Sequence, residues 1–117
     1  MKKVCVLVKS CTYGMASPGE AYRTIIGLAG MDVDTSAVLV DDGVFVAIKG
    51  QDPSVIEMQS LELAYKSIGE FGAKLYIHKE SMEKRGIKKD EIIEANMLDT
   101  DALRKMINEA DAVITFT

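Results

Sequence analysis

The sequence predicts an α/β fold with three layers, α/β/α, around a mostly parallel five-stranded sheet. Two observations carry this prediction. Short apolar runs rich in β-branched residues alternate with stretches whose apolar residues recur at helical spacing. Several of these runs end abruptly in polar residues, as strands do when they leave a buried parallel sheet. A chain of 117 residues is long enough for one core, so we expect a single domain over residues 1–117.

The first half of the chain supplies two strands and two helices. Residues 4–8 are apolar and mostly β-branched, which is typical of a first strand. The segment 17–20 is a capping box with proline at the first helical position, and helical spacing continues to residue 30. Residues 36–40 predict the second strand. Asp52 is placed to cap a second helix that ends at Gly72.

The second half continues the alternation. We predict a third strand at 74–78, a short helix at 79–85 and a fourth strand at 92–97. A further helix is capped by Asp99 or Thr100, and the last strand covers 112–116. The pattern predicts crossovers between parallel strands but leaves their order open.

Composition excludes several classes of function. The net charge of −4, without a basic stripe, argues against nucleic-acid binding. No apolar run approaches the roughly 18 residues that a membrane span requires. We expect no secretion signal, because Lys9 interrupts the first apolar run, and therefore expect a cytoplasmic protein with free thiols at Cys5 and Cys11. No phosphate-binding glycine loop and no Cys-x-x-Cys pair occurs, so we predict no cofactor and no metal.

Candidate site residues follow three predicted strands, where ligands bind in open α/β sheets. They are Ser10 and Cys11, then Asp41, Asp42 and Gly43, and finally His78.

Each candidate has a structural alternative. Cys11 precedes a predicted helix N-terminus, whose field favours the thiolate, but it could equally be an ordinary loop residue. His78 could orient an anion or move a proton, or it could simply be hydrogen-bonded at the sheet edge. Asp41 and Asp42 could bind a metal or cap a turn. We expect Gly43 to take a positive φ after its strand.

The residues after Gly43 predict an interface. The segment 44–48 is entirely apolar, and Val44, Phe45 and Val46 are its first members. An exposed apolar patch of that size is typical of a protein–protein contact.

Three motifs resemble the DsrE/DsrF-like family, which includes the TusC-type and DsrF-type subunits of bacterial sulfur relays. The first is Asp42-Gly43-Val44-Phe45, followed by Gly50-Gln51. The second joins 75–78 to 82–87, and the third runs from 101–103 to 110–116. In order, these motifs cover nearly the whole chain, and the DsrF-like branch is the most similar.

The resemblance implies a sulfur-relay protein that transfers persulfide sulfur between thiols, or a subunit of such an assembly. It implies trimers or hexamers, either of one chain or with related DsrE-type subunits, and a protein that donates or accepts the sulfur. It also implies the strand order 4-3-2-1-5, whereas a flavodoxin-like order would be 2-1-3-4-5. The carrying cysteine of DsrE-type subunits follows the third strand, where this sequence has His78. The DsrF-type subunit serves as a partner in the assembly.

Three functions therefore remain open. A sulfur carrier, with sulfurtransferase activity, would use Cys11. A non-catalytic assembly subunit or oligomeric small-ligand binding module would need no reactive thiol. A small enzyme would need Asp41, Asp42 and His78 within reach of one another, with or without a metal.

Overall fold

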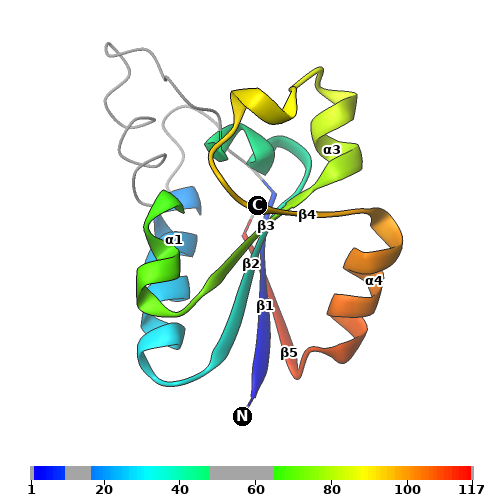
Figure 1. The fold of residues 1–117 in the computed structure, drawn as a ribbon. Helices are drawn as coiled ribbons and strands as arrows, with labels where there is room; N and C mark the ends of the chain where they lie inside the picture. Colours follow the sequence, from blue (N-terminus) through cyan, green and yellow to red (C-terminus); the bar gives the residue numbers. More distant parts are fainter. Residues whose placement is uncertain (1, 10–16, 48–64, 117) are drawn as a thin grey trace.

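The five strands form one fully parallel sheet in the order β4-β3-β2-β1-β5 (Figure 1). The computed structural model describes residues 2–9, 17–47 and 65–116. The strands are β1 (Lys3–Val8), β2 (Asp34–Leu39), β3 (Lys74–His78), β4 (Asn96–Leu98) and β5 (Ala112–Phe116). The predicted α/β class is confirmed, and so is the strand order that the family resemblance implied.

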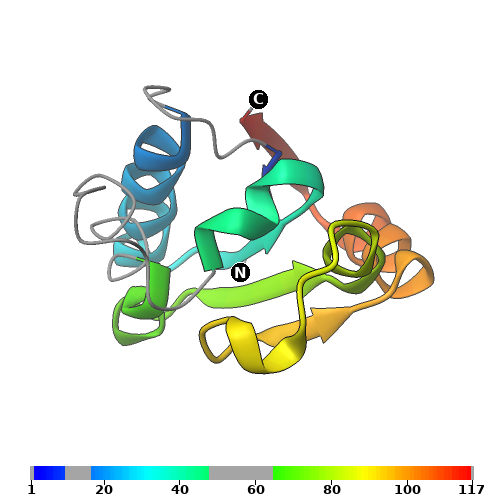
Figure 2. The ribbon, with the colours of Figure 1, turned by 90° about the horizontal axis from the view of Figure 1, so that it is seen from above.

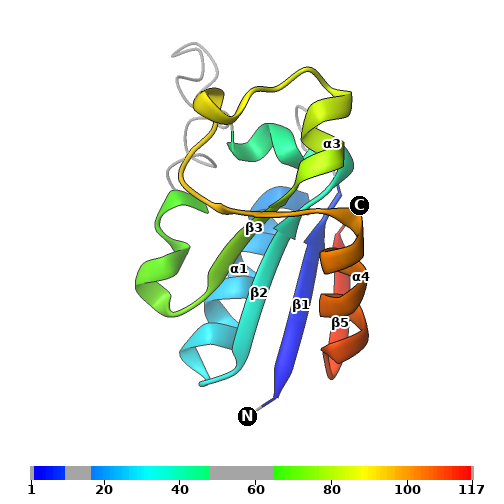
Figure 3. The same cartoon turned by 45° about the vertical axis from the view of Figure 1, so that its right-hand side comes forward.

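Helices cover both faces of the sheet (Figures 2 and 3). Within the described residues, the α-helices with bounds are α1 (Ser17–Gly30), α3 (Lys79–Lys84) and α4 (Thr100–Glu109), and the 3-10 helices are η1 (Asp41–Ala47), η2 (Ile68–Phe71) and η3 (Lys89–Glu91). The predicted helix after Asp52 lies largely outside the described residues. Within the described ranges, no helix has the length and apolar character needed to cross a membrane.

Side chains alternate between two apolar clusters, one on each face of the sheet. Val6, Val8 and Leu39 are fully buried on the face that α1 covers. On the opposite face, Cys5 and Val38 are buried beneath α4, whose own apolar residues stay only partly buried. The face of the sheet under α4 is therefore less completely covered than the face under α1.

The fourth strand is shorter than the sequence predicts. Ile92 and Ile93 read locally as strand residues, but they lie outside β4 and are buried in the cluster on the α1 face. The N–H of Ile93 donates to the carbonyl of Ala47, 2.7 Å away, which ties this segment to η1. Tertiary packing has overridden β-propensity at these two positions.

The chain changes sides of the sheet between β3 and β4. Met82 and Ile87, which follow β3, join the cluster on the α1 face, whereas Leu103 and Met106, which follow β4, join the cluster on the α4 face. The connections leaving these two neighbouring strands thus diverge at their carboxyl ends. Such a divergence is where open α/β sheets place their ligand crevice.

Candidate functional site

A pocket lies at this divergence, with a volume of about 620 Å³. Its walls come from the segments that follow β2, β3 and β4. The lining residues are Asp41, His78, Glu80, Ser81, Glu83, Lys84, Arg85 and Thr100. The structure therefore brings together two of the predicted strand ends, those of β2 and β3.

His78 is held by hydrogen bonds at both ring nitrogens. It is the last residue of β3 and is paired in register with Leu98, so the start of α4 lies beside it. Its Nδ1 is 2.6 Å from the hydroxyl of Ser81, and its Nε2 is 2.9 Å from the hydroxyl of Thr100. Glu80 accepts from Thr100 through the backbone N–H at 2.7 Å and through the hydroxyl at 2.5 Å.

These contacts fix where the protons lie. Thr100 donates its only hydroxyl proton to the Glu80 carboxylate, so it must accept from Nε2–H of His78. In the neutral ring Nδ1 is then the acceptor, and the hydroxyl of Ser81 donates to it. The oxygen of Ser81 in turn accepts from the backbone N–H of Asp41, 2.9 Å away. The result is a directional chain of hydrogen bonds that ends at a carboxylate.

This chain of hydrogen bonds lowers the pKa of the Glu80 carboxyl group. The principal cause of the lowered pKa is the hydrogen bond from the Thr100 hydroxyl, followed by that from the backbone N–H of Thr100, and the field of His78 acts in the same direction. Hydrogen bonds to a charged carboxylate stabilise that form. Glu80 is therefore ionised at neutral pH and accepts from the first backbone N–H of α4.

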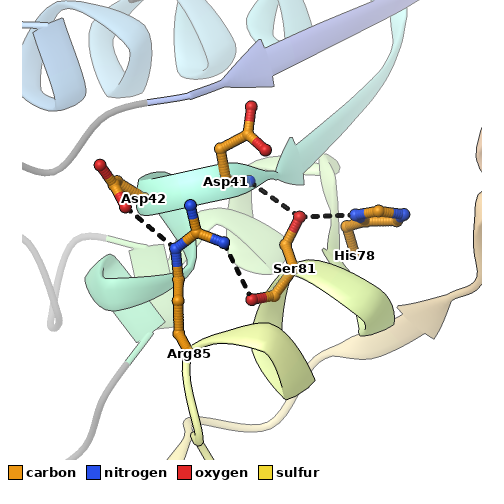
Figure 4. A network of polar contacts seen from close by, with 5 residues as sticks. All are labelled: Asp41, Asp42, His78, Ser81 and Arg85. Atoms are coloured by element: carbon orange, nitrogen blue, oxygen red, sulfur yellow. Dashed lines mark hydrogen bonds and ion pairs between the residues drawn. The ribbon is translucent and has the colours of Figure 1, made fainter.

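Asp41 and Asp42 have separate structural roles (Figure 4). Asp41 has a φ of 50°, a left-handed conformation that aspartate tolerates better than most residues. Asp42 accepts a hydrogen bond from Nε of Arg85 at 2.9 Å, and Nη1 of Arg85 donates to the Ser81 carbonyl at 3.2 Å. Among the described residues, no group of three or more histidine, cysteine, aspartate or glutamate side chains could hold a metal ion.

Gly43 is required for a different reason from the one predicted. Positive φ occurs at Asp41 and not at Gly43, so that prediction was wrong. A Cβ atom at position 43 would overlap the backbone carbonyl oxygen of Val8. Glycine is therefore needed because η1 packs directly on the end of β1.

The predicted apolar interface is largely internal. Val44 and Ala47 have no exposed surface and belong to the core, so they form no part of an exposed patch. Phe45 is partly buried against the same core. Val46 is in η1, and its side chain lies outside the described part of the molecule.

Of the two cysteines, only Cys5 lies within the described residues. Ser10 and Cys11 lie outside the described residues. Cys5 is 1% exposed, and burial raises its pKa to about 11. At neutral pH Cys5 is therefore a thiol rather than a nucleophilic thiolate.

The family model described as DsrE/DsrF-like matches residues 2–116. This chain belongs to that family. The sulfur-relay resemblance in the sequence is thus confirmed at the level of the family.

Curated relatives match this DsrE/DsrF-like chain over its whole length. The intracellular sulfur oxidation protein DsrF of Allochromatium vinosum is 26% identical, with coverage of 99% of this chain and 97% of that protein. Protein TusC of Buchnera aphidicola is 24% identical, with coverage of 99% and 100%.

Solved structures share the fold of this DsrE/DsrF-like chain. The ychN protein from E. coli superposes with a TM-score of 0.77 at 22% identity, covering 99% of this chain and all of that one. MTH1491 from Methanobacterium thermoautotrophicum, a protein of unknown function, gives a TM-score of 0.75 at 13% identity, covering 98% and 99%.

The sequence did not single out four residues of the hydrogen-bond network at the site: Glu80, Ser81, Arg85 and Thr100. Thr100 was recognised only as a possible cap of the last helix, a role that Asp99 takes by accepting from the N–H of Ala102. The available signal was the polar residues at the beginning of each helix after a strand. That signal does not reveal which of them meet across the sheet edge.

Proposed function

We propose that this chain is a subunit of a sulfur-relay assembly. The observation that supports this most directly is the family match over residues 2–116, together with a full-length relative named for intracellular sulfur oxidation. A cytoplasmic location is part of the same proposal.

Cys11 is the thiol that we propose accepts sulfur. Its thiolate attacks the outer sulfur of a donor persulfide, a new S–S bond forms on Cys11, and the donor leaves as a thiolate. Protons balance because the donor's persulfide S–H is retained by the product. The burial and raised pKa of Cys5 argue against Cys5 in this role.

A second candidate is an assembly subunit without a carrier thiol. It is favoured by His78, which stands at the end of β3, where the resemblance places the cysteine of DsrE-type subunits. Both ring nitrogens of His78 are engaged with neighbouring hydroxyls, so the ring orders the site rather than presenting a free nitrogen to it. In this role the chain would act in a trimer or hexamer, alone or with DsrE-type subunits.

Intact-mass measurement after incubation with a low-molecular-weight persulfide distinguishes the two candidates. A carrier gains the mass of one sulfur atom, loses this gain in Cys11→Ser and keeps it in Cys5→Ser. No gain in the wild-type protein would reject the carrier role. Co-purification with a separately expressed DsrE-type subunit then tests the assembly role.

A further inference from the structure

A second pocket lies between α4 and the amino-terminal half of the sheet, with a volume of about 370 Å³. Lys3, Ser36 and Lys74 line it from the first halves of β1, β2 and β3, and Lys105 lines it from α4. The parallel strands all begin at the same edge of the sheet (Figure 3). The residues that line this pocket from β1, β2 and β3 are therefore remote from the site at the carboxyl ends of the strands. The two pockets share no lining residue.

Positive charge converges on this pocket in a chain whose net charge is −4. Lys3, Lys74 and Lys105 come from three different elements. Within the described residues the structure contains one ion pair, between Arg85 and Asp42. The ammonium groups of these three lysines therefore form no ion pair with a described carboxylate. Asp34 and Glu109 also line the pocket, and the ammonium groups outnumber these carboxylates.

Part of the lining of this pocket is apolar. Met106 and the ring of Tyr76 lie on its walls, and Cys5 lies at the sheet surface beneath α4. The raised pKa of Cys5 keeps its sulfur protonated, so no thiolate repels an anion. The hydroxyls of Ser36 and Tyr76 also line the pocket and have donors available.

We propose that this pocket binds a small organic anion, in which a phosphate, sulfonate or carboxylate group is attached to an apolar body. The lysines and hydroxyls hold the charged group, and Met106 and Tyr76 contact the apolar part. The volume suits a small molecule, since ligand pockets begin at about 300 Å³. The inference does not depend on the proposed sulfur-relay role.

The test uses 8-anilinonaphthalene-1-sulfonate, which combines a sulfonate with an aromatic body, and follows its fluorescence with the folded protein at neutral pH. Lys105→Gln should weaken binding about two- to fivefold, as expected for one partly exposed ion pair. Arg104→Gln is the matched control: its residue is exposed on the same helix, carries the same charge and does not line the pocket. It should leave the affinity unchanged.

A double variant, Lys3→Gln with Lys105→Gln, should lower the affinity further than Lys105→Gln alone, because both ammonium groups are proposed to hold the same anion. Inorganic phosphate should compete only weakly, because it lacks the apolar part. Backbone amide NMR shifts on dye binding should concentrate at Ser36, Tyr76 and Met106. Equal affinity of wild type, Lys105→Gln and the double variant, or shifts confined to the carboxyl ends of the strands, would overturn the proposal.

Discussion

Nε2 of His78 and Oγ1 of Thr100 are 2.9 Å apart, although 22 residues separate them in sequence. This contact joins the end of β3 to the beginning of α4 at the point where the chain changes faces. Its direction is set by Glu80, because the threonine hydroxyl donates to the carboxylate and can only accept from the ring. One carboxylate therefore determines the tautomer of a histidine that it does not touch.

Removing the hydroxyl of Thr100 tests this network. Thr100→Val deprives Nε2–H of His78 of its part-buried acceptor, so we expect a loss of about 0.5–1.5 kcal/mol in the free energy of unfolding. It also removes a hydrogen-bond donor from the exposed carboxylate of Glu80. Denaturant melts give the stability, and ¹⁵N shifts of the imidazole report the Nε2–H tautomer in the wild type. Thr115→Val, at an exposed position of β5, is the control and should change stability by no more than about 0.5 kcal/mol. Equal stability of the two variants would contradict the network as described.

The pKa of Glu80 should respond to the same substitution. The wild-type pKa lies below the ordinary value of a glutamate, chiefly because of the Thr100 hydroxyl, and Thr100→Val should raise it towards that value. A lowered folded-state pKa contributes stability above the unfolded-state pKa, and this contribution disappears as the pH falls through the folded-state value. NMR titration of the Glu80 side chain measures the shift. An identical titration in both proteins would show that the hydroxyl is not its cause.

Gly43→Ala should destabilise the protein by about 1–3 kcal/mol. The new Cβ atom would overlap the Val8 carbonyl, and a backbone atom within a buried strand cannot easily move away. Gly27→Ala in α1 is the opposite case, because a Cβ there meets no atom within 4 Å. It should stabilise the helix by about 0.5–1 kcal/mol. Thermal melts of both variants measure these changes. A Gly43→Ala variant as stable as the wild type would mean that η1 can move away from β1.

Alkylation should distinguish the two cysteines. Cys5 is buried and its pKa is raised to about 11, so its labelling at neutral pH should be slow and should accelerate only as the pH approaches that value. We predict faster labelling of Cys11, with peptide mass spectrometry resolving the two sites. Equally slow labelling of both thiols would weaken the carrier role and favour the assembly subunit.

The assembly itself is best tested on the unmodified protein. We predict a closed trimer or hexamer by light scattering at micromolar concentration, and a monomer there would reject homo-oligomerisation. Phe45→Glu is a less selective probe than the sequence suggests. Phe45 packs against the core, so a glutamate would destabilise the subunit as well as any contact made by residues 44–48.

The local pattern of apolar and polar residues was sufficient to predict most of the fold. The segments 74–78 and 112–116 are strands with the predicted bounds, because short apolar runs rich in β-branched residues and flanked by polar residues favour strands, in the interior of the sheet (β3) and at its edge (β5). The local pattern failed at Ile92 and Ile93, which lie outside β4: both are buried in the core, Ile92 makes only an isolated bridge, and the N–H of Ile93 donates to the carbonyl of Ala47 in η1. It also assigned the positive φ to Gly43 rather than Asp41, because glycine satisfies both a left-handed backbone and a close contact.

The site was less predictable than the fold. His78 and the aspartates could be found, since they lie at or just beyond the carboxyl ends of strands. Ser81 and Thr100 could not, because their importance lies in contacts between separate segments: Ser81 meets Asp41 across 40 residues of sequence. Such pairings depend on strand order, which the periodicity of the sequence alone leaves open.

The position of β1 between β2 and β5 affects how the polypeptide folds as it leaves the ribosome. The backbone groups on one edge of β1 can pair early with β2, but those on its other edge can pair only once β5 has been made. The backbone N–H of Lys3 also donates to the side chain of Asp111, 108 residues later in the sequence. Until that late segment emerges, a nascent polypeptide exposes an apolar strand with unpaired backbone groups, a template for aggregation. Pairings between such distant segments also slow folding. Until β5 can pair with β1, the folding polypeptide is therefore exposed to misfolding.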